Sequence, residues 1–325
     1  MCTAITFHTY DHYFGRNLDL ELSYGEKVVI TPRNYPLHFR EVDTIKKHLA
    51  IYGMAIVIDN YPLYFDAANE SGLSMAGLNF DGNAYYNYEL KDGYDNISPF
   101  EFIPWVLSQC EDVDDVHALL KRLNLVNIDF SDSLPLSPLH WIVADQNQSI
   151  TIESTKEGLK VYDNPVGVLT NNPSFDYHML NLNNYLHLSV KNPNNEFSRF
   201  LSLKAYSRGM GAIGLPGDLS STSRFIRASF NKMNTVSEDT EEASVNNCFK
   251  IMTSVEQING LNDVGEHQYE KTIYTACYNV DKGIFYYKTY DSSMINAIYL
   301  HHTNVNSDNL ITYELNHEFK VNVQN

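Results

Sequence analysis

Two kinds of apolar pattern, alternating with polar residues or unbroken between glycine, asparagine and proline, predict β-strands at both ends of the chain. The early runs are Cys2–Phe7, Lys27–Thr31, Ile51–Ile58 and Leu73–Phe80. Strand patterns return in the middle and near the end, at Leu139–Ala144, Ser149–Glu153, Leu159–Tyr162, Thr272–Val280, Ile284–Tyr290, Ala297–Leu300 and Leu310–Leu315.

Apolar residues spaced three and four apart predict helices in the middle of the chain. Asp112 stands where its side chain can cap one of them, and Glu241 and Glu242 give another an acidic first turn. The expected helices are Pro99–Cys110, Asp112–Asn124, Tyr177–Leu186, Ser220–Lys232 and Thr240–Val255.

This order of elements predicts one α+β domain over residues 2–325. Strands lie at both ends, helices lie between them, and no stretch has the composition of an interdomain linker. Short turns between strands, such as residues 281–283, predict antiparallel sheets. The helices are expected to cover the outer faces of those sheets.

Composition narrows the classes of function. The chain has 325 residues, 43% of them hydrophobic, which is enough for a sizeable core. Its formal net charge of -17 argues against a nucleic-acid partner, which would need clustered lysine and arginine. A small anionic substrate needs only one or two local arginines and stays open. No apolar run reaches the length of a membrane span, so no membrane partner is expected.

Four cysteines are too few for a disulfide framework in a chain of this length, and none forms C-x-x-C. A reducing compartment is therefore the simpler expectation. The first residues lack the basic and apolar regions of a signal peptide. Together these features predict a cytoplasmic protein.

Cys2 is the first candidate for chemistry. If Met1 is removed, Cys2 carries both a thiol and a free α-amine, whose usual pKa of about 7.7–8.0 lets it act as a base near neutral pH. The thiol can give that amine its proton and attack a carbonyl carbon, so nucleophile and base share one residue. Taken alone, a buried strand cysteine is the commoner explanation.

The segment Gly15–Asp19 adds two charged groups. Arg16 can stabilise a thiolate or a developing negative charge, and Asp19 can orient the α-ammonium. Residues three apart on a regular strand face opposite sides, so the prediction is that both reach Cys2 only if the chain bends after Gly15. An exposed Arg–Asp pair of little energetic value is the alternative.

A series of short motifs runs in order along nearly the whole chain, and jointly it is specific. The motifs are Met1–Thr3, Gly15–Asp19, Ile30–Asn34, Asn69–Leu73, Ala76–Phe80, Val168–Pro173, Gly214–Asp218 and Ser223–Arg227. They resemble the choloylglycine hydrolase family, which contains bile salt hydrolases and penicillin V acylases. The resemblance implies a four-layer αββα sandwich of the N-terminal-nucleophile hydrolases. It also implies amide hydrolysis without a metal or organic cofactor, and a homotetramer.

The resemblance also assigns roles to single residues. Cys2 matches the nucleophile and base, and Arg16 and Asp19 match residues that position and polarise it. Asn79 matches a backbone N–H donor of the oxyanion hole, and Asn171 matches a side-chain donor. The sixth residue, Arg224, matches an arginine that supports the site through hydrogen bonds. Outside the resemblance, the two asparagines read as turn residues and Arg224 as a helix-surface residue.

The leading expectation for the substrate is a bile salt, in which an amide joins a steroid acid to glycine or taurine. Apolar candidates for the pocket wall are Leu18, Ile58, Tyr61 and Leu134. Arg208 lies in a segment that resembles the family's taurine-favouring loop, where a guanidinium would suit a sulfonate. A solvent-exposed loop arginine is the alternative. The G-x-G-x-x-G pattern that follows it, Gly209–Gly214, has no strand before it and is expected to be a loop.

Three rivals remain at this point. A penicillin V acylase or an acyl-homoserine-lactone acylase would use the same machinery. A binding protein could keep the fold without turnover, and retention of Met1 would favour it. A glutamine amidotransferase also uses an amino-terminal cysteine, but it would need a second synthase domain for which no span is left.

Overall fold

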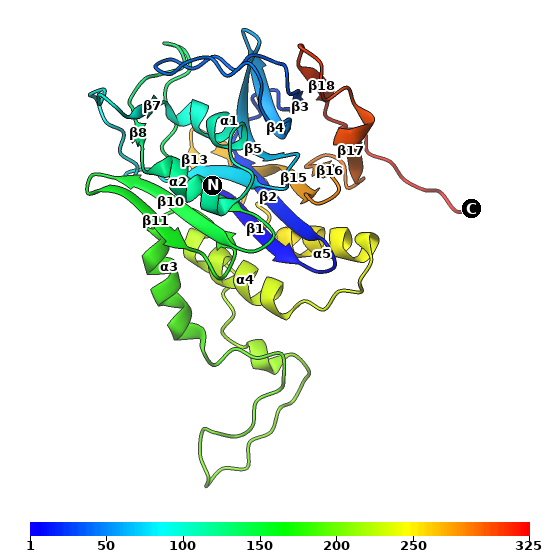
Figure 1. The fold of residues 1–325 in the computed structure, drawn as a ribbon. Helices are drawn as coiled ribbons and strands as arrows, with labels where there is room; N and C mark the ends of the chain where they lie inside the picture. The colour runs from blue at the N-terminus through cyan, green and yellow to red at the C-terminus, as the bar shows by residue number, and fades with distance from the viewer.

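The computed structural model describes residues 1–325, and two antiparallel sheets form its centre (Figure 1). One sheet has the order β12-β1-β2-β15-β16-β17, and the other has the order β11-β10-β9-β6-β5-β4-β3-β18. The strands of the first sheet are β1 (Cys2–His8), β2 (His12–Leu20), β12 (Val168–Leu169), β15 (Lys271–Asn279), β16 (Ile284–Thr289) and β17 (Asn296–Tyr299). Those of the second are β3 (Lys27–Thr31), β4 (Ile51–Ile58), β5 (Tyr61–Asn69), β6 (Ser74–Asn79), β9 (Leu139–Ala144), β10 (Ser149–Thr155), β11 (Gly158–Asp163) and β18 (Ile311–Glu314).

Helices cover both outer faces. On one side, α4 (Ser221–Asn234) and α5 (Glu241–Thr253) pack on β1, β2 and β15, and on the other α1 (Phe102–Leu107) packs on β5 and β6 (Figure 1). The remaining helices are α2 (Val113–Leu120) and α3 (Phe175–Asn181), with 3-10 turns at Pro99–Glu101, Leu182–Tyr185, Met210–Ala212 and Leu300–His302. The predicted α+β class and four-layer sandwich are confirmed.

Two apolar cores hold the layers together. The larger lies between the sheets and under α4 and α5, and it includes Cys2, Leu18 and Phe225. The smaller lies under α1 and α2, where the ring of Phe102 meets Trp141 edge-on with centroids 4.8 Å apart. None of the helices combines the length and apolar character that a membrane span requires.

Most of the predicted strands and helices are present, but several helices are shorter than predicted. The predicted helix Pro99–Cys110, for example, is a 3-10 turn followed by α1 and ends at Leu107. The predicted helix Asp112–Asn124 does begin at Asp112, whose side chain accepts a hydrogen bond from the Asp115 N–H at 2.9 Å. It ends at Leu120, because the next residues form β8 (Leu123–Leu125), which pairs in parallel with β7 (Asp95–Ile97). A further short hairpin joins β13 (Asp263–Gly265) to β14 (Gln268–Tyr269).

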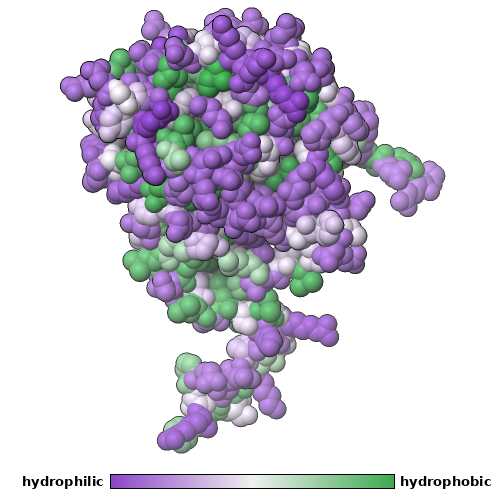
Figure 2. Space-filling view, viewed as in Figure 1, coloured by the Kyte–Doolittle hydropathy of each residue, from purple (hydrophilic) through white to green (hydrophobic).

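A long segment between α3 and α4, residues 187–213, projects away from the body of the molecule (Figure 1). It carries exposed apolar side chains, and Figure 2 shows hydrophobic residues scattered over this projection. Its two limbs meet at Gly211, whose carbonyl accepts the Ser189 N–H at 2.8 Å. A Cβ at Gly211 would lie 2.0 Å from the Lys191 carbonyl oxygen, so this crossing admits only glycine.

Candidate active site

The Cys2 thiol lies in the space between the two sheets, near the end of the six-stranded sheet. Cys2 opens β1 and pairs directly with Leu18 of β2, so the two side chains share a face. The residue is only 3% exposed. Arg16 lies two residues from Leu18 on the same face, and its Nη2 is 3.3 Å from Cys2 Sγ.

Arg16 is fully enclosed and held by three further groups. Its Nη1 donates to Asp66 at 2.8 Å and to the Tyr274 hydroxyl at 3.1 Å, and its Nη2 donates to the Gly77 carbonyl at 2.8 Å. Burial alone would lower the pKa of Arg16, but Tyr274, Cys2 and Asp66 outweigh it and raise that pKa. The guanidinium is therefore a permanent cation beside the sulfur.

Asn171 reaches the backbone of Cys2 from the loop after β12. Its Oδ1 accepts the Cys2 N–H at 2.8 Å and an Arg224 N–H at 2.6 Å. Its Nδ2 points the other way and donates to the Asn79 carbonyl at 2.8 Å. The amide therefore joins the end of β1 to the end of β6, with its donor side next to Asn79.

The backbone N–H of Asn79 is free of its neighbouring strand. Phe80 and Pro138 are the next opposed residues beyond the last pair of β6 and β9, Asn79 and Leu139. The Phe80 N–H donates to the Pro138 carbonyl at 2.8 Å. Because hydrogen-bonded pairs alternate in an antiparallel ladder, the Asn79 N–H points away from β9. Pairing of β6 with β5 ends at Ala76, so neither neighbouring strand pairs with this N–H. Both expected oxyanion donors thus lie at one place.

Arg224 and Asp19 lie on the helix-facing side of the six-stranded sheet. Arg224 is fully buried in α4, and its Nη1 donates to the Cys2 carbonyl at 2.5 Å and to Thr3 Oγ1 at 2.6 Å. Asp19 Oδ1 accepts from Thr272 Oγ1 at 2.6 Å, and its Oδ2 lies 4.0 Å from Arg224. Burial raises the pKa of Asp19 and lowers that of Arg224.

The expected bend after Gly15 is absent. β2 runs without interruption from His12 to Leu20, so Arg16 and Asp19 do face opposite sides. The two side chains therefore lie on opposite faces of the six-stranded sheet. Arg16 contacts the thiol on the face toward the second sheet, and Asp19 lies beside Arg224 on the face toward the helices. Asp19 makes no side-chain hydrogen bond to Cys2, and its buried Oδ2 accepts no hydrogen bond, with Arg224 4.0 Å away.

Met1 lies against the backbone of Asp19. Its ammonium donates to the Asp19 carbonyl at 2.7 Å and pairs with Glu270, while its own carbonyl accepts the Asp19 N–H at 3.0 Å. While Met1 is attached, the Cys2 nitrogen is an amide and cannot act as a base. Removal of Met1 would leave a charged or neutral amine between Asn171 and the polar groups around Asp19.

The five residues proposed for substrate contact fall into three places. Leu18 lies beside Cys2 and is 2% exposed. Ile58 and Tyr61 pair across the turn at the end of the β4–β5 hairpin. The centroid of the Tyr61 ring lies 6.0 Å from that of Phe130, and Phe130 belongs to the same loop as half-buried Leu134.

Arg208 is the exception among the five. It is exposed on the projecting segment, residues 187–213, and makes no hydrogen bond or ion pair with the other site residues. The structure of one chain therefore does not bring Arg208 to Cys2.

Sequence reasoning missed the groups that hold Arg16. Asp66 is fully buried and accepts from Arg16 and from the hydroxyls of Tyr274 and Tyr278. A lone aspartate within the apolar run Tyr61–Ala68 was a usable signal, since a buried carboxylate must be paired.

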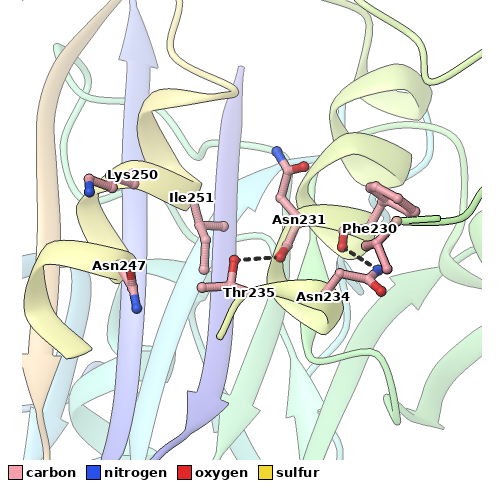
Figure 3. Close-up of a pocket in the computed structure, with 8 residues that line it drawn as sticks. Phe230, Asn231, Asn234, Thr235, Asn247, Lys250 and Ile251 are labelled. Atoms are coloured by element: carbon pink, nitrogen blue, oxygen red, sulfur yellow. Dashed lines mark hydrogen bonds between the residues drawn. The ribbon is translucent and has the colours of Figure 1, made fainter. Parts of the chain in front are cut away.

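A separate cavity of about 370 Å³ lies between the carboxyl-terminal halves of α4 and α5 (Figure 3). Its lining includes Asn231, Asn234 and Lys250, and none of the six predicted catalytic residues. Two of the polar groups around it already bond within α4: Asn234 Nδ2 donates to the Phe230 carbonyl at 2.8 Å, and Thr235 Oγ1 donates to the Asn231 carbonyl at 2.7 Å. This cavity is distinct from the candidate site.

Comparison with known proteins places this geometry in a family. Residues 2–313 match the family described as linear amide C–N hydrolases, choloylglycine hydrolase family. The chain belongs to the choloylglycine hydrolase family. The family match and the full-length similarities below agree with the resemblance inferred from the motifs.

Among its relatives, a bile salt hydrolase/transferase of Lactiplantibacillus plantarum is 56% identical over 98% of both chains. A conjugated bile acid hydrolase of Lactobacillus acidophilus is 40% identical over 96% of this chain and all of the other. The C2A mutant of the conjugated bile acid hydrolase from Clostridium perfringens superposes over all of both chains with a TM-score of 0.92 and 36% identity. Penicillin V acylase from Agrobacterium tumefaciens shares the fold, with a TM-score of 0.73, 16% identity and 96% and 91% of the two chains covered.

Proposed function

We propose that this chain hydrolyses the amide bond of glycine- or taurine-conjugated bile salts and releases the free bile acid and the amino acid. The observation that carries the proposal is the placement of Cys2. Its thiol lies 3.3 Å from a permanently charged guanidinium, and its nitrogen lies 2.8 Å from the Asn171 amide. The names of the full-length relatives support conjugated bile salts as the substrate class.

The proposed reaction begins after loss of Met1. The free Cys2 amine takes the thiol proton, the sulfur forms a bond to the amide carbon, and the carbonyl oxygen becomes an oxyanion. Asn171 Nδ2 and the Asn79 N–H are the proposed donors to that oxyanion. When the carbon–nitrogen bond breaks, the α-ammonium returns the proton to the leaving amine. Water then attacks the thioester and releases the acyl group.

Arg16, Asp19 and Arg224 are proposed to hold this arrangement. Arg16 stabilises the thiolate, and Arg224 fixes the Cys2 carbonyl and the orientation of Asn171. The Oδ2 of buried Asp19 accepts no hydrogen bond and is proposed to compensate the charge of the new ammonium once Met1 leaves.

The steroid is proposed to lie against Leu18, Ile58, Tyr61 and Leu134. The first lies beside the thiol, and the hairpin end that carries the next two meets the loop of Leu134 through the Tyr61–Phe130 ring contact. A rigid apolar substrate gains most of its affinity from such aliphatic and aromatic walls.

We further propose that residues 2–325 act as one domain in a cytoplasmic homotetramer. The projecting segment supports association, because Phe197, Phe200 and Tyr206 are each more than 80% exposed there and would be costly to leave in water. Contact of that segment with a second copy is also the route by which Arg208 would meet a taurine sulfonate. Four buried free cysteines fit a reducing compartment.

A penicillin V acylase or acyl-homoserine-lactone acylase remains the second candidate, because the shared fold and the six catalytic residues suit any of these amides. The test is hydrolysis of glycocholate, taurocholate and penicillin V by one preparation. The proposal expects cleavage of the conjugated bile salts; cleavage of penicillin V alone would overturn it.

Two cysteine variants serve as controls. Cys2→Ser should lose turnover, and Cys110→Ser, which removes a buried thiol in the other core, should keep it. An intact mass that retains Met1, together with no turnover, would favour a binding protein.

A further inference from the structure

Two buried histidines support the segment that carries Asn171. His140 on β9 places its Nε2 3.0 Å from the Thr170 carbonyl oxygen. His178 on α3 places its Nε2 2.8 Å from the Asn171 carbonyl oxygen. Both rings are fully buried. The consecutive carbonyl groups of Thr170 and Asn171 are therefore each hydrogen-bonded by an imidazole, one from β9 and one from α3.

The partners fix the proton positions. A carbonyl oxygen can only accept, so both Nε2 atoms carry hydrogen. His140 Nδ1 faces Glu153 Oε1 at 3.1 Å, and that oxygen also accepts the Phe175 N–H at 2.9 Å. His178 Nδ1 is buried without a partner, and burial lowers the pKa of His178 to about 4, so the ring stays neutral near pH 7.

Stacking fixes the ring planes. His140 lies flat on Phe80, with centroids 4.3 Å apart and an interplanar angle of 6°. His178 stacks on Phe225 of α4, with centroids 4.6 Å apart and an angle of 20°. Phe80 directly follows Asn79, so His140 touches both limbs of the proposed oxyanion hole. Phe225 directly follows Arg224, so His178 joins the loop to the helix that holds Cys2.

We infer that His140 and His178 are positioning residues of the oxyanion hole, which clamp the Thr170 and Asn171 carbonyl groups and so set where Asn171 Nδ2 points. This inference rests on the proposed function. The Asn171 N–H is also held, since it donates to Ser221 Oγ at 2.8 Å. Because its N–H and its carbonyl are both hydrogen-bonded, the backbone of Asn171 is held in one orientation. The position of its Cβ, from which the side-chain amide extends, is thereby fixed.

Loss of a clamp should act on the transition state rather than on substrate binding. Without the His178 donor, the buried Asn171 carbonyl would rotate to find another partner. Asn171 Nδ2 would then move relative to the oxyanion, which forms only as the reaction proceeds. The thiol would keep its contact with Arg16, because Arg16 is held from the opposite sheet.

The test compares His178→Phe, which keeps the stacked ring but removes the donor, with His178→Gln, whose amide nitrogen can replace Nε2. Steady-state rates are measured with conjugated bile salts and penicillin V, and Cys2 reactivity is measured as the rate of alkylation by iodoacetamide, which needs no oxyanion hole. His12→Phe is the matched control, since His12 is equally buried but bonds Thr6. Thermal unfolding of each variant measures how much of it is folded.

The inference expects His178→Phe to lower kcat about 10- to 100-fold with KM and alkylation rate close to wild type, and His178→Gln to restore most of kcat. Unchanged kcat in His178→Phe, or kcat and alkylation falling together with the folded fraction, would overturn it. If the wild type cleaves only penicillin V, the bile-salt assignment fails while the clamp is still tested on that substrate. A wild type inactive on every acyl substrate would overturn both.

Discussion

The guanidinium of Arg224 and the nitrogen of Cys2 both donate to one atom, Oδ1 of Asn171, at 2.6 and 2.8 Å. An oxygen with two donors, one of them a cation, must face β1 and α4. The amide nitrogen of Asn171 is thereby forced to face Asn79 and the proposed oxyanion. The buried arginine thus determines which end of the amide faces the proposed oxyanion.

Asn171→Asp tests this orientation. The carboxylate keeps an acceptor for Arg224 and Cys2, but it replaces the donor with a negative charge. We expect kcat to fall on the order of 10²–10³-fold or more, with a smaller change in KM. The control is Asn172→Asp, which alters the neighbouring amide that donates only to the Asp81 carbonyl. Equal rates for Asn171→Asp and wild type would show that this amide is not a donor in the reaction.

The loss of stability in Asp66→Asn should show that the buried ion pair with Arg16 contributes more than a pair at the surface. Arg16 and Asp66 are 1% and 0% exposed, so neutralising Asp66 leaves a cation in the core without its counter-charge. We expect the free energy of unfolding to fall by about 3–5 kcal/mol, and kcat to fall as Arg16 loses its position. Asp95→Asn, which breaks the pair of half-buried Asp95 with exposed Arg122, should cost less than about 1 kcal/mol. Urea denaturation of both variants measures this, and equal losses would contradict it.

Stability should fall as the pH drops below about 6.5. Burial lowers the pKa of His178 to about 4 and that of His12 to about 3, each from 6.5. Between these values the unfolded chain binds protons that the folded chain does not. Each histidine therefore removes about 1.4 kcal/mol of unfolding free energy per pH unit, and the contribution of His178 levels off below about pH 4. Urea denaturation between pH 7 and 4 measures the slope, and His178→Phe should be less steep than wild type. An identical slope would contradict the assignment.

The strands and helices that the sequence predicted well are those in which apolar residues are buried and polar residues are exposed. Lys27–Thr31 and Leu139–Ala144 have apolar runs that match their burial, and the predicted bounds hold. Asp112 marked the start of α2 through its capping side chain. Its end was hidden, because Leu123 suits either a helix face or the strand that pairs with β7.

The site itself explains why β2 and β5 were missed. β2 carries Arg16, Asn17 and Asp19, all buried, so polar groups face both sides and no alternation appears. Asn17, for example, donates to the Met252 carbonyl at 2.9 Å from the helix-facing side. β5 contains Pro62 and buried Asp66, which argue against a central strand. The proposed catalytic roles came from the motif resemblance. Asp66 left a signal in its apolar run, whereas the contacts of His140 and His178 could be found only from the fold.

The proposed mechanism requires that the nitrogen of Cys2 is a free amine when the thiol attacks. One chain can be prepared in two forms from a cleavable fusion, one beginning at Cys2 and one retaining a single glycine before it. The direct measurement is the rate of taurocholate hydrolysis by each form, with intact mass recorded to verify the first residue. We predict that the glycine-blocked form is slower by about 10²–10⁴-fold, since it lacks the general base. Equal rates for the two forms would contradict the mechanism.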